Sequence, residues 1–116
     1  MKHYTIYHNP RCSKSRQALS VLREHGINPE VIRYLDTPPT KQELHRLLDL
    51  GNLPIHSITR QNETLYKELN LQEASRDSLL IHLAKHPILL QRPIIFTDKN
   101  AVVGRTSEAI LSLITS

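Results

Sequence analysis

Apolar and polar residues alternate along this chain with two different periods, and the changes of period divide it into predicted elements. Residues 4–8 alternate in the manner of a strand. From Ser13 to about His25 the apolar residues follow helical spacing, and Gly26 is a common helix stop. Residues 30–35 are rich in β-branched and aromatic side chains and predict a second strand. This strand–helix–strand order predicts a right-handed parallel unit.

The middle of the chain is predicted to be helical. Two prolines end the second strand, and Thr40 with Glu43 forms a capping-box pattern at the start of a helix that stops at Gly51. Leucines at helical spacing predict a further helix over residues 75–86, ended by a proline. Between these two helices we expect an irregular connection over residues 54–62 and a short helix over residues 63–69.

The C-terminal part predicts a hairpin followed by a helix. A strand over residues 92–97 has a proline, Pro93, near its start, and residues 101–103 form its partner strand. Thr106 or Ser107 is expected to cap the last helix. No linker or repeat divides the chain, so we expect one domain over residues 1–116.

This element order predicts the α/β class, and specifically a mixed sheet that resembles the thioredoxin-like (glutaredoxin-like) fold with a helical insertion. Pro93 suits that fold, in which a cis-proline often lies opposite the active cysteine.

Composition narrows the functional classes. The 116 residues carry a formal net charge of +4, with scattered basic residues, one phenylalanine and no tryptophan. Without basic runs or stacking platforms, nucleic-acid binding is not favoured, and a small anionic substrate explains the charge equally well. No long apolar run or signal-peptide pattern is present, so we expect a cytoplasmic protein that does not engage a membrane.

Cys12 is the only cysteine, which excludes an intramolecular disulfide. It lies at the predicted strand-to-helix turn, where backbone N–H groups and the helix dipole favour a thiolate. His8 and three basic side chains at positions 11, 14 and 16 add positive or potentially positive charge nearby. A lone cysteine is often simply a small buried apolar residue, but this basic setting favours a reactive thiol.

The sequence around Cys12 resembles the HNPxCxxSR signature of the arsenate reductase (ArsC) family. Further similar segments follow in the same order and at similar spacing over essentially the whole chain: residues 34–38, 60–62, 86–89, 92–94 and 104–108. The chain is most similar to the short branch of the family.

The resemblance implies arsenate reduction by Cys12, with Arg60, Arg92 and Arg105 holding the oxyanion. Guanidinium forks bind tetrahedral oxyanions well. Thr106 stands where the family usually has proline. Without that proline we expect a looser turn to orient Arg105.

The resemblance also implies supporting roles beside the cysteine. His8 is expected to support the thiolate or to hydrogen-bond within the loop; capping of the first strand is the alternative. Asn9 and Ser15 are expected to orient the loop or to donate to the thiolate.

Because Cys12 begins a C-x-x-S rather than a C-x-x-C run, an external thiol must complete the reaction. The resemblance implies glutathione as co-substrate and glutaredoxin as the resolving partner. No bound cofactor is implied. No metal site is expected either, because His82 and His86 are four residues apart on a predicted helix but have no third ligand.

Two alternative functions remain open at this stage. One is a thiol oxidoreductase of unknown substrate on the same fold. The other is a regulator resembling Spx-type proteins, which bind RNA polymerase; these usually carry C-x-x-C and lack the HNP lead-in present here.

Overall fold

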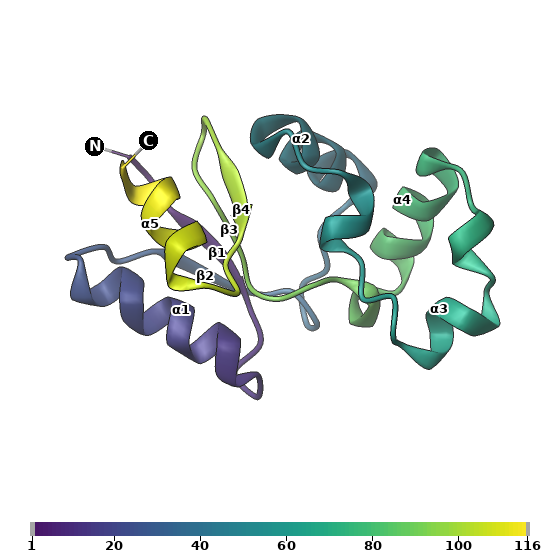
Figure 1. Cartoon of the computed structure of the whole chain (residues 1–116), viewed down its shortest axis with the longest axis horizontal. Helices are drawn as coiled ribbons and strands as arrows, with labels where there is room; N and C mark the ends of the chain where they lie inside the picture. The colour runs from purple at the N-terminus through teal and green to yellow at the C-terminus, as the bar shows by residue number, and fades with distance from the viewer. Residues whose placement is uncertain (1, 116) are drawn as a thin grey trace.

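The computed structural model describes residues 2–115 and arranges helices around a small sheet (Figure 1). The first half of the chain contains β1 (Thr5–His8), α1 (Ser13–Glu24), β2 (Glu30–Arg33), α2 (Lys41–Gly51) and the 3₁₀ helix η1 (Ile55–Ile58). The second half contains α3 (Thr64–Glu68), η2 (Leu71–Glu73), α4 (Arg76–Lys85), η3 (Pro87–Leu89), β3 (Ile94–Phe96), β4 (Ala101–Val103) and α5 (Ser107–Thr115).

The four strands form one mixed sheet in the order β2-β1-β3-β4. β1 and β2 are parallel, with Ile6 opposite Val31, whereas β3 is antiparallel to both β1 and β4. The parallel pair is the predicted strand–helix–strand unit, and the β3–β4 pair is the predicted hairpin. The α/β prediction of a thioredoxin-like mixed sheet with a helical insertion is confirmed.

Side chains alternate between the two faces of the sheet, and each face has its own core. Ile6 and Ile95 point into a cluster with α1 and α5, whereas Tyr7 and Ile94 point into a larger cluster with the segment from α2 to η3. In Figure 1, α1 and α5 lie on one side of the sheet and α2, α3 and α4 extend on the other. The helical insertion is therefore part of the second core.

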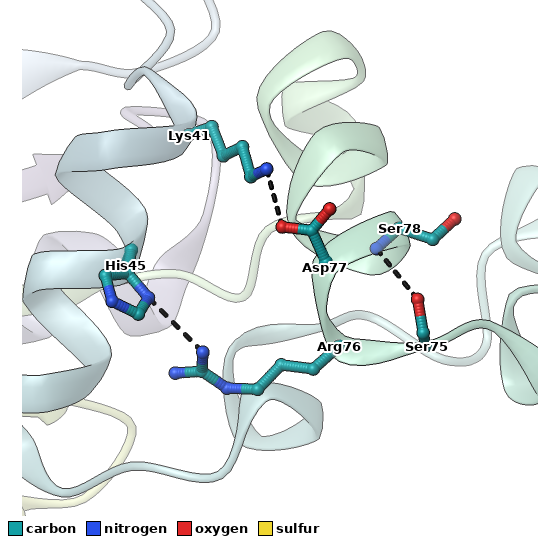
Figure 2. A network of polar contacts seen from close by, with 6 residues as sticks. All are labelled: Lys41, His45, Ser75, Arg76, Asp77 and Ser78. Carbon is teal, nitrogen blue, oxygen red and sulfur yellow. Dashed lines mark hydrogen bonds and ion pairs between the residues drawn. The ribbon is translucent and has the colours of Figure 1, made fainter.

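The helical insertion is held together mainly by buried leucines from α2 and α4: Leu44, Leu47, Leu48, Leu79, Leu80 and Leu83. Exposed polar contacts join the same two helices at the surface (Figure 2). Lys41 Nζ lies 2.6 Å from Asp77, and Arg76 Nη1 lies 3.2 Å from Nδ1 of His45. Ser75 caps α4 by accepting from the Ser78 N–H at 3.2 Å.

Several predicted boundaries are corrected. The second strand ends at Arg33 rather than residue 35, because the chain turns at Tyr34. The capping box of Thr40 and Glu43 is confirmed, and α2 ends at Gly51 as predicted, with Asn52 after it in the left-handed conformation at a φ of 49°. Residues 54–62 are less irregular than expected, because they contain η1.

The start of α5 resolves an open alternative. Thr106 Oγ1 accepts a hydrogen bond from the Ala109 N–H at 3.1 Å, so Thr106 rather than Ser107 caps this helix. No helix within residues 2–115 is long and apolar enough to cross a bilayer.

Candidate active site

Cys12 lies where β1 passes into α1, as the sequence predicts. It is the N-cap residue of α1, with extended backbone angles (φ −96°, ψ 121°). The preceding loop is tightly bonded: the Cys12 N–H donates to the Asn9 carbonyl at 3.0 Å, and the Arg11 N–H donates to Asn9 Oδ1 at 3.0 Å. Asn9 therefore shapes the turn through both its main chain and its side chain.

The surroundings of Cys12 favour its thiolate. Partial burial alone would raise the pKa of Cys12, but the backbone N–H groups of Ser15 and Lys14 and the Arg92 guanidinium outweigh it and lower the pKa. The first turn of α1 and Arg92 therefore act on the charged form, which is the nucleophile.

Ser15, His8 and Asn9 form a buried cluster beneath the cysteine loop. Ser15 is fully buried, and its Oγ lies 2.6 Å from Nδ1 of His8 and accepts from the Asn9 N–H at 3.0 Å. Burial lowers the pKa of His8, and nearby Arg23, Arg33 and Arg16 lower it further. His8 is therefore neutral at physiological pH.

This neutrality corrects one expectation from the sequence. His8 does not add positive charge beside Cys12. Its contact is a hydrogen bond within the loop, which is one of the two roles foreseen for it. Ser15 Oγ accepts from the Asn9 N–H and still has both a proton and a lone pair for Nδ1 of His8, so it can bond either His8 tautomer.

Arg92 enters the site from the segment that leads into β3, directly before Pro93. The Arg92–Pro93 peptide bond is cis, as the thioredoxin-like fold suggested. Arg92 Nε is buried and has no hydrogen-bond partner within residues 2–115. A buried guanidinium donor beside a thiolate is well suited to an anionic ligand.

Arg60 reaches the site from the junction between η1 and α3. Its N–H donates to the Leu89 carbonyl at 2.7 Å, and Thr59 bridges Leu90, so this segment runs beside the one leading to Arg92. Arg60 Nη1 forms an ion pair with Glu63, and less than a third of either side chain is exposed. An oxyanion must therefore share Arg60 with a carboxylate, which the sequence did not reveal.

Arg105 occupies a different position from Arg60 and Arg92. It is exposed, and its Nη1 donates to the Arg92 carbonyl at 2.8 Å. It is absent from the lining of the cavity described next. In this conformation Arg105 braces the main chain of Arg92. With Thr106 acting as the helix cap, the turn after Arg105 is ordered without proline.

A cavity of about 440 Å³ lies beside Cys12, and its lining is unusually basic. Arg11, Arg33, Arg60 and Arg92 all line it, against a single acid, Asp36. Such a concentration of guanidinium groups raises the local concentration of anions. The structure thus brings Arg60 and Arg92 to one cavity but leaves Arg105 at its edge.

Tyr34 also lines this cavity and was not singled out from the sequence as a functional residue. It is 1% exposed, and its hydroxyl interacts with Asn9, Arg60, Arg92 and Cys12. Burial raises the pKa of Tyr34, so the phenol keeps its proton and is a neutral donor. One sequence signal was available: Tyr34 directly follows a parallel strand, and ligands commonly bind beyond such strand ends.

The described residues offer no metal centre. Within residues 2–115, no three His, Cys, Asp or Glu side chains are grouped to hold an ion. His82 and His86 stack with their ring centroids 6.2 Å apart. The chemistry available to this site is that of an activated thiolate beside arginine and phenol donors.

Comparison with known proteins identifies relatives over nearly the whole length of the chain. The model of the ArsC family matches residues 7–113. An arsenate reductase of Neisseria meningitidis serogroup A is 48% identical over 113 residues, which cover 95% of this chain and 97% of that protein. An arsenate reductase of Escherichia coli is 40% identical over 116 residues, covering 98% of this chain and 82% of that protein.

Solved structures agree with the sequence comparisons. The arsenate reductase from Vibrio cholerae superposes with a TM-score of 0.92 at 43% identity, covering 97% of this chain and 98% of that one.

Proposed function

The chain belongs to the ArsC family, and we propose on that basis that it reduces arsenate to arsenite with Cys12 as the nucleophile. The observation that carries the proposal is the position of Arg92, which stabilises the Cys12 thiolate and also lines the basic cavity. A nucleophile and an anion-binding group thus share one small site. Relatives described as arsenate reductases supply the identity of the anion.

In the first step, the Cys12 thiolate attacks the arsenic atom of dihydrogen arsenate. An S–As bond forms, one As–O bond breaks, and the departing oxygen leaves as water after taking up a proton. Arsenic remains As(V) in this step. Arg60 and Arg92 hold the remaining oxygens, and the neutral Tyr34 hydroxyl donates a hydrogen bond to the anion.

Reduction requires two electrons, which the chain's single cysteine cannot supply by forming a disulfide within the chain. A thiol RSH attacks the Cys12 sulfur, the S–As bond breaks with its electron pair on arsenic, and arsenite leaves as As(III). Cys12 and RSH become a mixed disulfide. A second thiol then exchanges with this disulfide and restores Cys12. The net reaction consumes arsenate and two thiols and yields arsenite, water and a disulfide.

We assign glutathione to the first thiol and glutaredoxin to the second. Both assignments rest on the absence of a second cysteine and on the resemblance to the glutathione-dependent class. They also imply a reducing compartment, so the expected location is the cytoplasm. No bound cofactor takes part in this scheme.

The test is arsenate-dependent NADPH oxidation with glutathione, glutaredoxin and glutathione reductase. Wild-type protein should turn over, and Cys12→Ser should abolish turnover; Ser20→Ala, a change on the exposed face of α1, is the matched control. No arsenate-dependent rate in the wild type would refute the proposal. Reduction of a small disulfide without arsenate turnover would instead favour the thiol oxidoreductase alternative.

A further inference from the structure

The cavity beside Cys12 is much larger than the proposed anion requires. Arsenate has five heavy atoms, comparable to two or three water molecules at about 30 Å³ each. The cavity measures about 440 Å³, a size typical of sites that hold organic ligands. Once an oxyanion lies between Arg60 and Arg92, most of the volume is left for a second ligand.

The lining of the remaining part has a distinct chemical character, and it is centred on Arg33. Arg33 ends β2 and pairs in register with His8, so it lies at the same edge of the sheet as the cysteine loop. Its Nε lies 3.3 Å from Asp36 Oδ2, and both residues line the cavity. Arg11 adds a second cation from the cysteine loop.

Apolar side chains complete this part of the cavity. Leu35 and Ile88 line it while 46% and 48% exposed, and Pro10 contributes a third apolar surface. Exposed branched aliphatic residues facing a cavity offer a surface for the methylene groups of a ligand. The region therefore combines cations, one carboxylate and apolar contacts in a cavity that is also lined by Asn9, Pro10 and Arg11 of the cysteine loop.

We propose that this region, which we call the Arg33 subsite, binds the small thiol that reduces the Cys12 adduct. The fitting ligand carries at least one carboxylate and an α-amino group. Its carboxylate binds the terminal nitrogens of Arg33, because the pair with Asp36 uses Nε. Its ammonium binds Asp36, and its carbon chain contacts Leu35 and Ile88. The inference rests on the proposed function and names the co-substrate class of the same site.

This arrangement also gives a reason for the large cavity. The reducing thiol must reach a sulfur that already carries arsenic, so both ligands occupy the site together. A cavity shaped for the oxyanion alone would exclude the thiol. Holding the thiol by its charged end turns a collision between two dissolved molecules into a reaction between bound partners.

The test compares thiols of different charge during arsenate turnover. Glutathione, neutral 2-mercaptoethanol and cationic cysteamine should be ranked by rate at equal thiolate concentration, in wild type and in Arg33→Gln. The rate with glutathione relative to 2-mercaptoethanol should fall about three- to tenfold in R33Q, which matches about 0.7–1.4 kcal/mol at a partly exposed site. Arg33→Glu should shift the preference further, toward cysteamine.

Arg46→Gln is the matched control, because it removes the same charge from an exposed arginine outside this cavity. Its thiol ranking should follow that of the wild type. An unchanged glutathione preference in R33Q, with arsenate turnover intact, would overturn the inference and leave the proposed function standing.

A binding measurement keeps the inference testable even if arsenate is not turned over. S-methylglutathione has the charges of glutathione but no reactive thiol. Calorimetry should show that it binds the wild type and R46Q alike and binds R33Q about three- to tenfold more weakly. Equal affinity in all three proteins, or no binding to the wild type, would overturn the Arg33 subsite.

Discussion

The hydroxyl of Ser15 lies 2.6 Å from Nδ1 of His8, and both side chains are buried beneath the loop that carries Cys12. The same hydroxyl accepts from the Asn9 N–H at 3.0 Å. One atom thus joins β1, the loop and α1. The shape of the cysteine loop consequently depends on a residue three positions beyond the cysteine.

Ser15→Ala should destabilise the protein. It leaves the partly buried Asn9 N–H and the buried His8 imidazole without their partner, which costs about 1–3 kcal/mol. Urea denaturation measures the change in the free energy of unfolding. Ser20→Ala on the exposed face of α1 is the control, with an expected change within about 0.5 kcal/mol. Equal effects of both substitutions would contradict the bonding role of Ser15.

The neutral state of His8 predicts a pH dependence of stability. Burial lowers the pKa of His8 in the folded protein, so the unfolded chain takes up the proton first, near pH 6.5. The contribution of His8 to stability is therefore complete above about pH 6.5 and declines as the pH falls toward the folded pKa.

The measurement compares wild type with His8→Gln. The difference in their free energies of unfolding should shrink between about pH 7 and pH 5, because only the wild type loses the His8 contribution. Other titrating groups are common to both proteins and cancel in the difference. A difference that stays constant over this range would show that His8 does not titrate as argued.

The pKa of Cys12 should lie below that of an unperturbed cysteine. The rate of alkylation by iodoacetamide against pH gives this pKa directly. Arg92→Gln should raise it, because Arg92 both bonds to the sulfur and attracts its charge. Arg76→Gln removes an arginine that contacts His45 between α2 and α4, is not among the groups that shift Cys12, and should leave the pKa of Cys12 unchanged. Identical alkylation profiles for wild type and R92Q would show that Arg92 does not stabilise the Cys12 thiolate.

Tyr34→Phe should weaken oxyanion recognition while preserving packing. Tyr34 lines the cavity together with Arg60 and Arg92, and its hydroxyl keeps its proton. Losing a hydrogen bond to an anion costs about 1–2 kcal/mol. The KM for arsenate should therefore rise about five- to thirtyfold. Tyr66→Phe in α3 is the control, since Tyr66 is buried in the helical insertion. Equal KM values for Y34F and wild type would show that the Tyr34 hydroxyl does not bind the anion.

The helical insertion should depend on its leucines rather than on its surface charges. Leu79→Ala removes a fully buried side chain and should cost about 2–5 kcal/mol. Asp77→Asn breaks the contact with Lys41 shown in Figure 2 and should cost less than about 1 kcal/mol, because both groups are substantially exposed. Thermal or urea denaturation would reveal a reversed ranking.

The features predicted best from the sequence are those that depend on residues close together along the chain. The strand pattern of residues 4–8 followed by helical spacing from Ser13 predicted Cys12 at a helix N-terminus, and the structure places it there. Thr40 and Glu43 form the predicted reciprocal bonds. Both depend on residues within a few positions of each other, so neighbouring sequence suffices to anticipate them.

Features that depend on tertiary contact were missed or misjudged. Nothing in the sequence showed that Glu63 would pair with Arg60, or that the Arg105 guanidinium would turn to the Arg92 carbonyl. The second strand was predicted two residues too long, because Tyr34 has strand propensity but turns into the cavity. The arginine set came from family resemblance, and its catalytic role stays a prediction.

The segments that meet at Cys12 come from opposite ends of the chain. The thiol is near the N-terminus, whereas Arg92 arrives only with the last strands. During synthesis the cysteine leaves the ribosome long before its guanidinium partner exists. A chain whose last strands are not yet in place therefore lacks the Arg92 contribution to the Cys12 thiolate and keeps only that of the first turn of α1. Pairing of β3 with β1 thus completes the set of groups that lower the pKa of Cys12.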